Sequence, residues 1–233
     1  MKVLLSVGHS ILKSGACTSA DGRPYGGVLE YSYNKGIVNR TAEYLRKAGH
    51  RVDVLLCPEL QFSRSTEESA YKIQRVNKGG YDLVVELHLN ASKYHNAGGC
   101  EVFYICEKGK QIAQQIQGRL SAVFSGRPIQ RRTDLYMLTK TVPVALIVES
   151  FFCDNAADCA AAKKADVARL IAEGIHGRDI PGDRLESEEI NKEEAAEGTL
   201  YRVQVGAYSV RANAEAMKKE LQAAGFEAIL VAA

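Results

Sequence analysis

The chain has 233 residues, 46% of them hydrophobic, and a formal net charge of +2. This length suits one large domain, or one domain with a small module, and the hydrophobic content is ordinary for a globular protein with a real core. No stretch approaches the roughly 20 apolar residues of a membrane span, so we expect no membrane insertion. The charge is too weak to favour a nucleic-acid partner.

Only five residues separate Met1 and Lys2 from the polar Gly8 and His9, which is too few for the apolar part of a signal peptide. We therefore expect the protein to be made and folded in the cytoplasm. Cysteines stay free thiols there, and no two of the six have CxxC spacing. A disulfide framework and a structural zinc knuckle are both disfavoured.

Apolar runs alternate with amphipathic stretches along residues 1–178. This pattern predicts strands at 3–7, 51–56, 81–87, 101–105, 135–138 and 144–148, and helices at 31–48, 66–78, 109–123 and within 154–178. A long polar loop over 10–29 is of the kind that usually carries function. The alternation predicts an α/β fold with a mainly parallel, doubly wound sheet flanked by helices.

The last part of the chain differs in composition. Residues 179–198 hold an acidic run and are expected to form a linker. Residues 199–233 predict a strand, a helix over 210–224 and a short strand, a βαβ unit that is half of a ferredoxin-like module. Because 35 residues are too few to bury a core alone, this unit docks on the first domain, pairs with a second copy or belongs to something larger.

Four polar residues stand out beside the predicted strands. His9, His88 and Glu149 each follow an apolar run, and Glu30 opens a predicted helix. Ligands bind doubly wound sheets at the carboxyl ends of the strands. Two imidazoles and a carboxylate there suit a catalytic zinc, and a second carboxylate suits the base beside it.

Other interpretations of these residues stay open. Glu30 can be a helix N-terminal acid that interacts with the dipole, and Glu149 can cap the following helix. A carboxylate after an apolar run nevertheless costs free energy unless it is paired or functional. Glu86, inside a strand, is expected to face a helix edge or a solvated rim. His95, in the loop after the third strand, is a candidate for substrate contact.

Four segments, in order along residues 1–178, resemble motifs of the zinc-dependent N-acetylmuramoyl-L-alanine amidases of the type-3 amidase family. They are VGHS, GGVLEYSYN, ELHLNAS and LYMLTKTVPVALIVESFFCDNAADC. The chain departs from the family where Ser10 and Ile11 replace the glycines after His9, and where Ser150 replaces the glycine after Glu149. These departures bear on the shape of the rim near His9.

The resemblance implies one Zn²⁺ in the catalytic domain, with His9, Glu30 and His88 as its ligands and Glu149 as the catalytic glutamate. Asn90 matches a family position beside the site and, like His95, is a candidate for substrate contact. The implied reaction is hydrolysis of the amide that joins the lactyl group of N-acetylmuramic acid to L-alanine in peptidoglycan. A zinc peptidase or deacetylase acting on another amide, or a non-catalytic wall-binding protein, remains an alternative.

The tail from Leu200 to Val231 resembles the first half of a SPOR-type peptidoglycan-binding repeat. Such a half-repeat would be completed by a longer chain or by a homodimer. An amidase with a wall-binding tail and no signal peptide resembles a phage or prophage endolysin, which is released through a membrane hole. Peptidoglycan is therefore the expected partner.

Overall fold

The structure is a computed structural model that describes residues 1–182, 211–223 and 229–230. The chain separates into two compact units, Met1–Ser187 and Glu188–Ala233. In the second unit, helix α7 (Arg211–Ala223) agrees with the helix expected over 210–224. The strand expected before α7 lies outside the described residues, and so does most of the strand expected after it.

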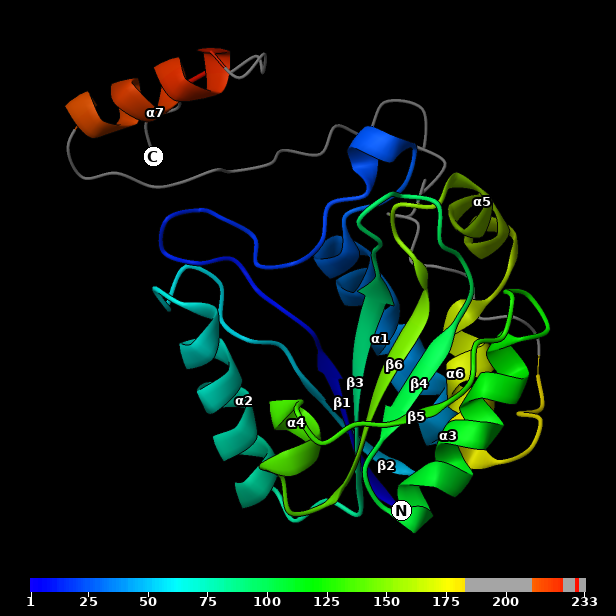
Figure 1. Ribbon diagram of the computed structural model, residues 1–233. Coiled ribbons are helices and arrows are strands. Elements are labelled where there is room, and N and C mark those ends of the chain that lie inside the picture. Colours follow the sequence, from blue (N-terminus) through cyan, green and yellow to red (C-terminus); the bar gives the residue numbers. More distant parts are fainter. Residues whose placement is uncertain (183–210, 224–228, 231–233) are drawn as a thin grey trace. The chain divides into compact units, whose positions relative to one another are not determined.

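A six-stranded sheet forms the centre of the first unit (Figure 1). Its spatial order is β2-β1-β3-β6-β4-β5, and neighbouring strands are parallel except for β4 and β6, which run in opposite directions. This arrangement confirms the mainly parallel, doubly wound sheet. The strands are β1 (Lys2–Val7), β2 (Arg51–Leu55), β3 (Leu83–Asn90), β4 (Glu101–Tyr104), β5 (Gln130–Arg131) and β6 (Val144–Phe152).

Helices cover both faces of this sheet (Figure 1). One face carries α1 (Glu30–Lys47), α3 (Glu107–Leu120) and α6 (Val167–His176), with α6 packed against both of the others. The other face carries α2 (Ser65–Lys78) and the short α4 (Tyr136–Thr139). A 3₁₀ turn, η1 (Arg23–Tyr25), lies in the long loop, and α5 (Ala156–Lys164) follows β6. Among the described helices, none is long and apolar enough to cross a membrane.

The two faces bury very different amounts of apolar surface. Because side chains alternate along a strand, Leu83, Val85 and Leu87 of β3 enter the large core under α1, α3 and α6. Val84 enters a much smaller core under α2 and α4. On that second face the next side chains along β3 are polar, so the sheet surface changes from apolar to polar toward the carboxyl ends of the strands.

The structure differs from the predicted elements in three ways. The strand expected over 135–138 is helix α4, in which Thr139 donates its backbone N–H to the carbonyl of Leu135. A short apolar run fits either state, and here Met137 and Leu138 are buried on the sheet as a helical turn. Strand β5 was not predicted because it has only two residues, both exposed and polar. Strands β3 and β6 also extend past their apolar runs, so His88 and Glu149 lie inside them.

Candidate metal centre and active site

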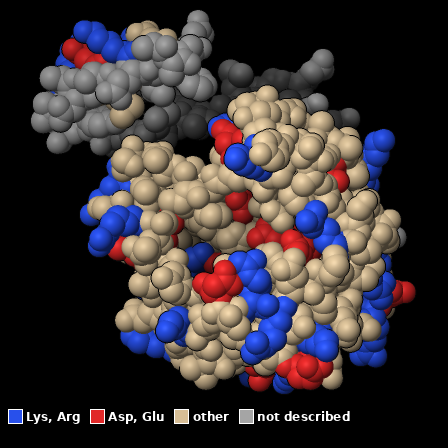
Figure 2. Space-filling model, viewed as in Figure 1, with Lys and Arg blue, Asp and Glu red and all other residues tan. Residues whose placement is uncertain are grey.

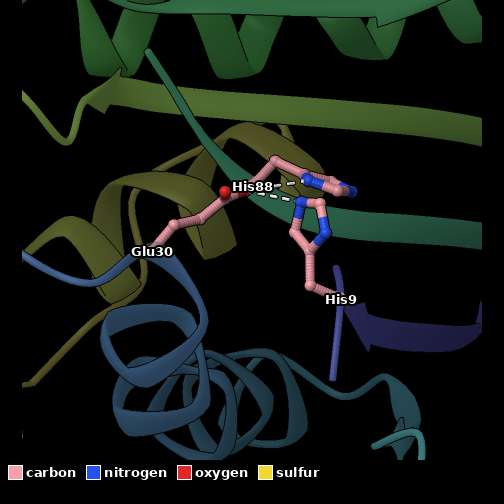
Figure 3. A group of neighbouring side chains, drawn as sticks. All are labelled: His9, Glu30 and His88. Carbon is pink, nitrogen blue, oxygen red and sulfur yellow. Dashed lines mark hydrogen bonds and ion pairs between the residues drawn. The ribbon is translucent and has the colours of Figure 1, made fainter. Parts of the chain in front are cut away.

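His9, Glu30 and His88 meet at the carboxyl-end edge of the parallel strands (Figure 3). His9 follows β1, Glu30 is the first residue of α1, and His88 is near the end of β3. Glu30 Oε1 lies 3.2 Å from His9 Nε2 and 3.0 Å from His88 Nδ1. Among the described residues, this is the one group of three His, Cys, Asp or Glu side chains placed to share a metal ion.

The spacing of these atoms fits a zinc ion. Ligands bound tetrahedrally at roughly 2.0–2.1 Å from zinc lie about 3.3 Å from one another. The two separations in this group, 3.2 and 3.0 Å, are close to that value. Two imidazole nitrogens and one carboxylate oxygen are also a donor set that zinc uses in catalytic sites, where a fourth position stays open.

Glu30 is buried and held by the backbone as well as by the histidines. Its Oε2 accepts the N–H of Ala20 at 3.0 Å, and its Oε1 accepts the N–H of Leu89 at 3.1 Å. Burial raises the pKa of Glu30, but the hydrogen bonds from His88 and His9 lower it by a larger amount. The net pKa is therefore well below the usual range. The carboxylate is therefore ionised, and it is also a helix N-terminal acid, so both sequence interpretations of Glu30 are compatible with its position.

The turn after β1 is shaped around the His88 ring. A Cβ on Gly8 would lie 2.2 Å from His88 Cε1, so only glycine fits beside that ring. His9 itself has a φ of 65°, a left-handed conformation that non-glycine residues adopt at a cost and that is frequent at functional sites. This backbone brings the two imidazoles edge to face, with ring centroids 4.9 Å apart.

Glu149 lies directly opposite His88 in the register of β3 and β6. A β-bulge follows this pair, because β6 has one more residue than β3 between the next partners. Glu149 Oε2 is buried and has no hydrogen-bond partner within the described part of the chain. Burial, reinforced by the nearby carboxylates, raises the pKa of Glu149 to about 7, although His88 opposes the rise. Such a carboxyl can take up and release a proton near neutral pH.

His88 and Glu149 line a cleft of about 500 Å³ on the sheet face that carries α2 and α4. Figure 2 shows acidic side chains gathered in a hollow on this side of the molecule. Asn90 lines the cleft and donates its amide N–H to Glu101 at 3.3 Å, and its contact with substrate stays a prediction. The remaining lining residues are Ser69, Glu86, Phe103, Gln130, Arg132, Leu135, Tyr136, Met137 and Ile147.

His95 is not among the residues that line this cleft. Its Nδ1 lies 2.8 Å from a carboxylate oxygen of the buried Asp154, and its ring stacks on Tyr25 with centroids 3.5 Å apart. The structure therefore places His95, in the 91–99 loop, against η1 and Asp154. Its contact with substrate stays a prediction.

Sequence reasoning did not identify two further residues of the cleft, Glu86 and Glu101. Glu86 is only 5% exposed and contacts Lys72 of α2, so it faces a helix, which is one of its two expected positions, and not a solvated rim. The period of two in LVVELHLN places Glu86 on the same side as His88, and that signal could have found it. Glu101 is likewise buried, on β4, directly opposite Glu149. No sequence pattern predicted that β4 runs in the reverse direction.

A family model described as N-acetylmuramoyl-L-alanine amidase matches residues 3–177, and a SPOR domain model matches residues 182–232. The solved catalytic domain of CD27L, an endolysin targeting Clostridia difficile, is 49% identical, with a TM-score of 0.74 over 78% of this chain and 99% of that one. LytC of Bacillus subtilis is 28% identical over 75% of this chain but only 34% of its own length. CwlM of Bacillus licheniformis is 25% identical over 99% of this chain and 85% of its own length.

The match over residues 3–177 takes in every residue of the cleft and of the group formed by His9, Glu30 and His88. The chain belongs to the N-acetylmuramoyl-L-alanine amidase family.

Proposed function

We propose that the first unit is a zinc-dependent peptidoglycan hydrolase that cleaves the amide between the lactyl group of N-acetylmuramic acid and L-alanine. The observation that carries this proposal is the convergence of His9, Glu30 and His88. His88 also lines a cleft with Glu149, whose buried Oε2 has no hydrogen-bond partner among the described residues. Membership of the amidase family supports the choice of bond. The chain spans about a third of the length of its relative LytC.

The residues present would hold the ion through His9 Nε2, Glu30 Oε1 and His88 Nδ1. A zinc ion bound there supplies a Lewis acid for the amide carbonyl and lowers the pKa of a water from about 15.7 to about 7. The ionised Glu30 supplies the negative charge that the donor set needs, and the two backbone N–H groups keep its carboxylate in place.

Glu149 performs the proton transfers in this proposal. Its carboxylate takes a proton from the attacking water as the C–O bond forms at the lactyl carbonyl. It then returns the proton to the alanine nitrogen as the C–N bond breaks. A pKa raised to about 7 makes both transfers accessible near neutral pH.

Glu149→Gln tests this role. We expect purified peptidoglycan to be cleaved roughly 10²–10⁴-fold more slowly, because the amide cannot accept the proton. Mass spectrometry of the digest measures the rate as peptides with a free L-alanine amino terminus. The matched control is Glu107→Gln, at an exposed acid in the first turn of α3, which is expected to leave the rate unchanged.

Three results would contradict the proposal. Unchanged turnover in Glu149→Gln would remove the assigned role. Wild-type products that expose an internal stem residue, or released acetate, would indicate a peptidase or a deacetylase. Binding to walls with no product at all would indicate a non-catalytic wall-binding protein.

The proposal extends to the setting in which the enzyme acts. The likeness to an endolysin catalytic domain supports an endolysin that is made in the cytoplasm and reaches the wall after phage-type release. The SPOR match supports a C-terminal module that binds peptidoglycan. Pairing of two chains through that module stays a prediction.

A further inference from the structure

A buried ion pair lies directly behind His88, on the side away from Glu30. Glu86 and Lys72 are each 5% exposed, and Lys72 reaches from α2 to contact the Glu86 carboxylate. Lys72 Nζ also donates to the backbone carbonyl of Val7 at 3.3 Å, and Ser6 Oγ lies 3.5 Å from Glu86. The carboxylate is thus held from two elements, β1 and α2, in addition to its own strand.

The other oxygen of this carboxylate faces the histidine. Glu86 Oε2 lies 3.2 Å from His88 Nε2, while His88 Nδ1 faces Glu30 Oε1 at 3.0 Å. The two nitrogens of a neutral imidazole have opposite roles: one carries the proton and the other offers its lone pair. If Nδ1 binds a metal, Nε2 carries the proton, and Glu86 is its acceptor.

We infer that Glu86 is a positioning residue, which accepts the Nε2–H of His88 and so fixes Nδ1 as the metal-binding atom, and that Lys72 holds Glu86 in place. This inference rests on the proposed metal site. Ligand histidines in general are oriented by such outer acceptors, and losing one typically weakens metal binding by about 10–100-fold. The geometry assigns that function in this chain to a specific pair of buried charges.

The competing explanation is that the ion pair only fastens α2 to the sheet. Changing one partner cannot decide between the two, because it leaves a buried charge unpaired and destabilises the fold. A decisive comparison removes both charges and varies only the acceptor that faces His88.

Two double variants of the full chain make this comparison. The first, Lys72→Met with Glu86→Gln, is the acceptor variant: it keeps a carbonyl acceptor for the Nε2–H, and its amide N–H₂ can donate to the Val7 carbonyl that Lys72 vacates. The second, Lys72→Met with Glu86→Met, is the acceptor-free variant, which fills the same space with no acceptor. Neither variant retains the ion pair, so both lose the same contribution of that pair to holding α2 on the sheet. Urea unfolding of both metal-free proteins checks that their stabilities match.

The readout is the affinity for Zn²⁺ alone, measured by competition with a chromophoric chelator. We expect the acceptor-free variant to bind Zn²⁺ about 10–100-fold more weakly than the acceptor variant. Equal affinities would overturn the inference and leave the pair with a purely structural role. If the wild type binds no Zn²⁺, the proposed function fails instead.

A second measurement needs no substitution. Nitrogen NMR of the zinc-loaded wild type reports which ring nitrogen of His88 carries the proton. We expect a protonated Nε2 whose hydrogen exchanges slowly with water because Glu86 accepts it. A protonated Nδ1, with the metal on Nε2, would overturn the inference even if the double variants failed to fold.

Discussion

Single atoms decide the shape of the proposed metal centre. The absence of a Cβ at Gly8 leaves room for the His88 ring, and the left-handed backbone of His9 aims its imidazole at Glu30. His88 then has an acidic partner on each side. Burial lowers its pKa, but the hydrogen bonds with Glu30 and Glu86 raise it to about 10 overall. A metal ion must displace that proton, so metal binding at this site is coupled to proton release.

Gly8→Ala should damage the metal centre while leaving the sheet intact. The added methyl group would lie 2.2 Å from His88 Cε1, so the ring has to move away from the other ligands. We expect Zn²⁺ affinity to fall by roughly 10–100-fold, as for other losses of ligand orientation. Gly36→Ala, where nothing lies within 4 Å of the new methyl group, is the control. It should bind Zn²⁺ like the wild type, and equal affinities in both variants would refute the argument.

The sequence allowed some of the site to be predicted and not the rest. His9, His88 and Glu149 could be found because each polar side chain interrupts or follows an apolar run. Glu30 was ambiguous until the family motifs were considered, since a helix N-terminal acid has an ordinary explanation. The contact between Lys72 and Glu86 could not be predicted, because it depends on how α2 lies across the sheet.

At the level of elements, the fold followed from apolar periodicity with three errors. Long amphipathic helices such as α1 and α6 have an unambiguous period. The run at 135–138 is too short to show a period, and its state is set by packing on the small core. Strands β3 and β6 were predicted too short, because their last residues keep pairing with neighbours after the hydrophobic run has ended.

The contact between α3 and α6 depends on a glycine. A Cβ on Gly174 of α6 would lie 2.5 Å from the Cα of Ile116 in α3. Gly174→Ala therefore forces the helices apart, and we expect the free energy of unfolding to fall by about 1–3 kcal/mol. Gly118→Ala, on the exposed side of α3 with nothing within 4 Å, should instead raise it by up to about 1 kcal/mol. Urea unfolding measures both, and a stabilised Gly174→Ala would contradict the packing argument.

At the scale of the whole first unit, one polar contact joins the end of α6 to the segment between α1 and β2. His50 Nε2 lies 3.0 Å from His176 Nδ1, and Arg178 Nε donates to His176 Nε2 at 2.9 Å. Burial lowers the pKa of both histidines. The amino terminus of Met1 lowers that of His50 further, and Arg178 lowers that of His176. The folded protein therefore favours the neutral pair.

This pair should make stability depend on pH. Since both pKa values are depressed in the folded state, the unfolded chain binds more protons below the ordinary histidine pKa of about 6.5. The stabilising contribution is thus present above that pH and is lost as the pH falls through it. We expect the free energy of unfolding to decrease less between pH 7.5 and 5.5 in a His50→Gln, His176→Gln double variant than in the wild type. Equal decreases in urea titrations would rule out this contribution.

The reversed direction of β4 has a consequence for how relatives of this protein can diverge. Because β4 is antiparallel to β6, the first residue of β4, rather than its last, lies at the rim of the sheet where the candidate site is. The connection over 91–99 consequently starts and finishes at that rim, without crossing the sheet. Insertions or deletions in this connection would add or remove chain beside Asn90 and Glu101, which line the cleft, while the strands keep their register, so the surroundings of the cleft can change without a change in the sheet.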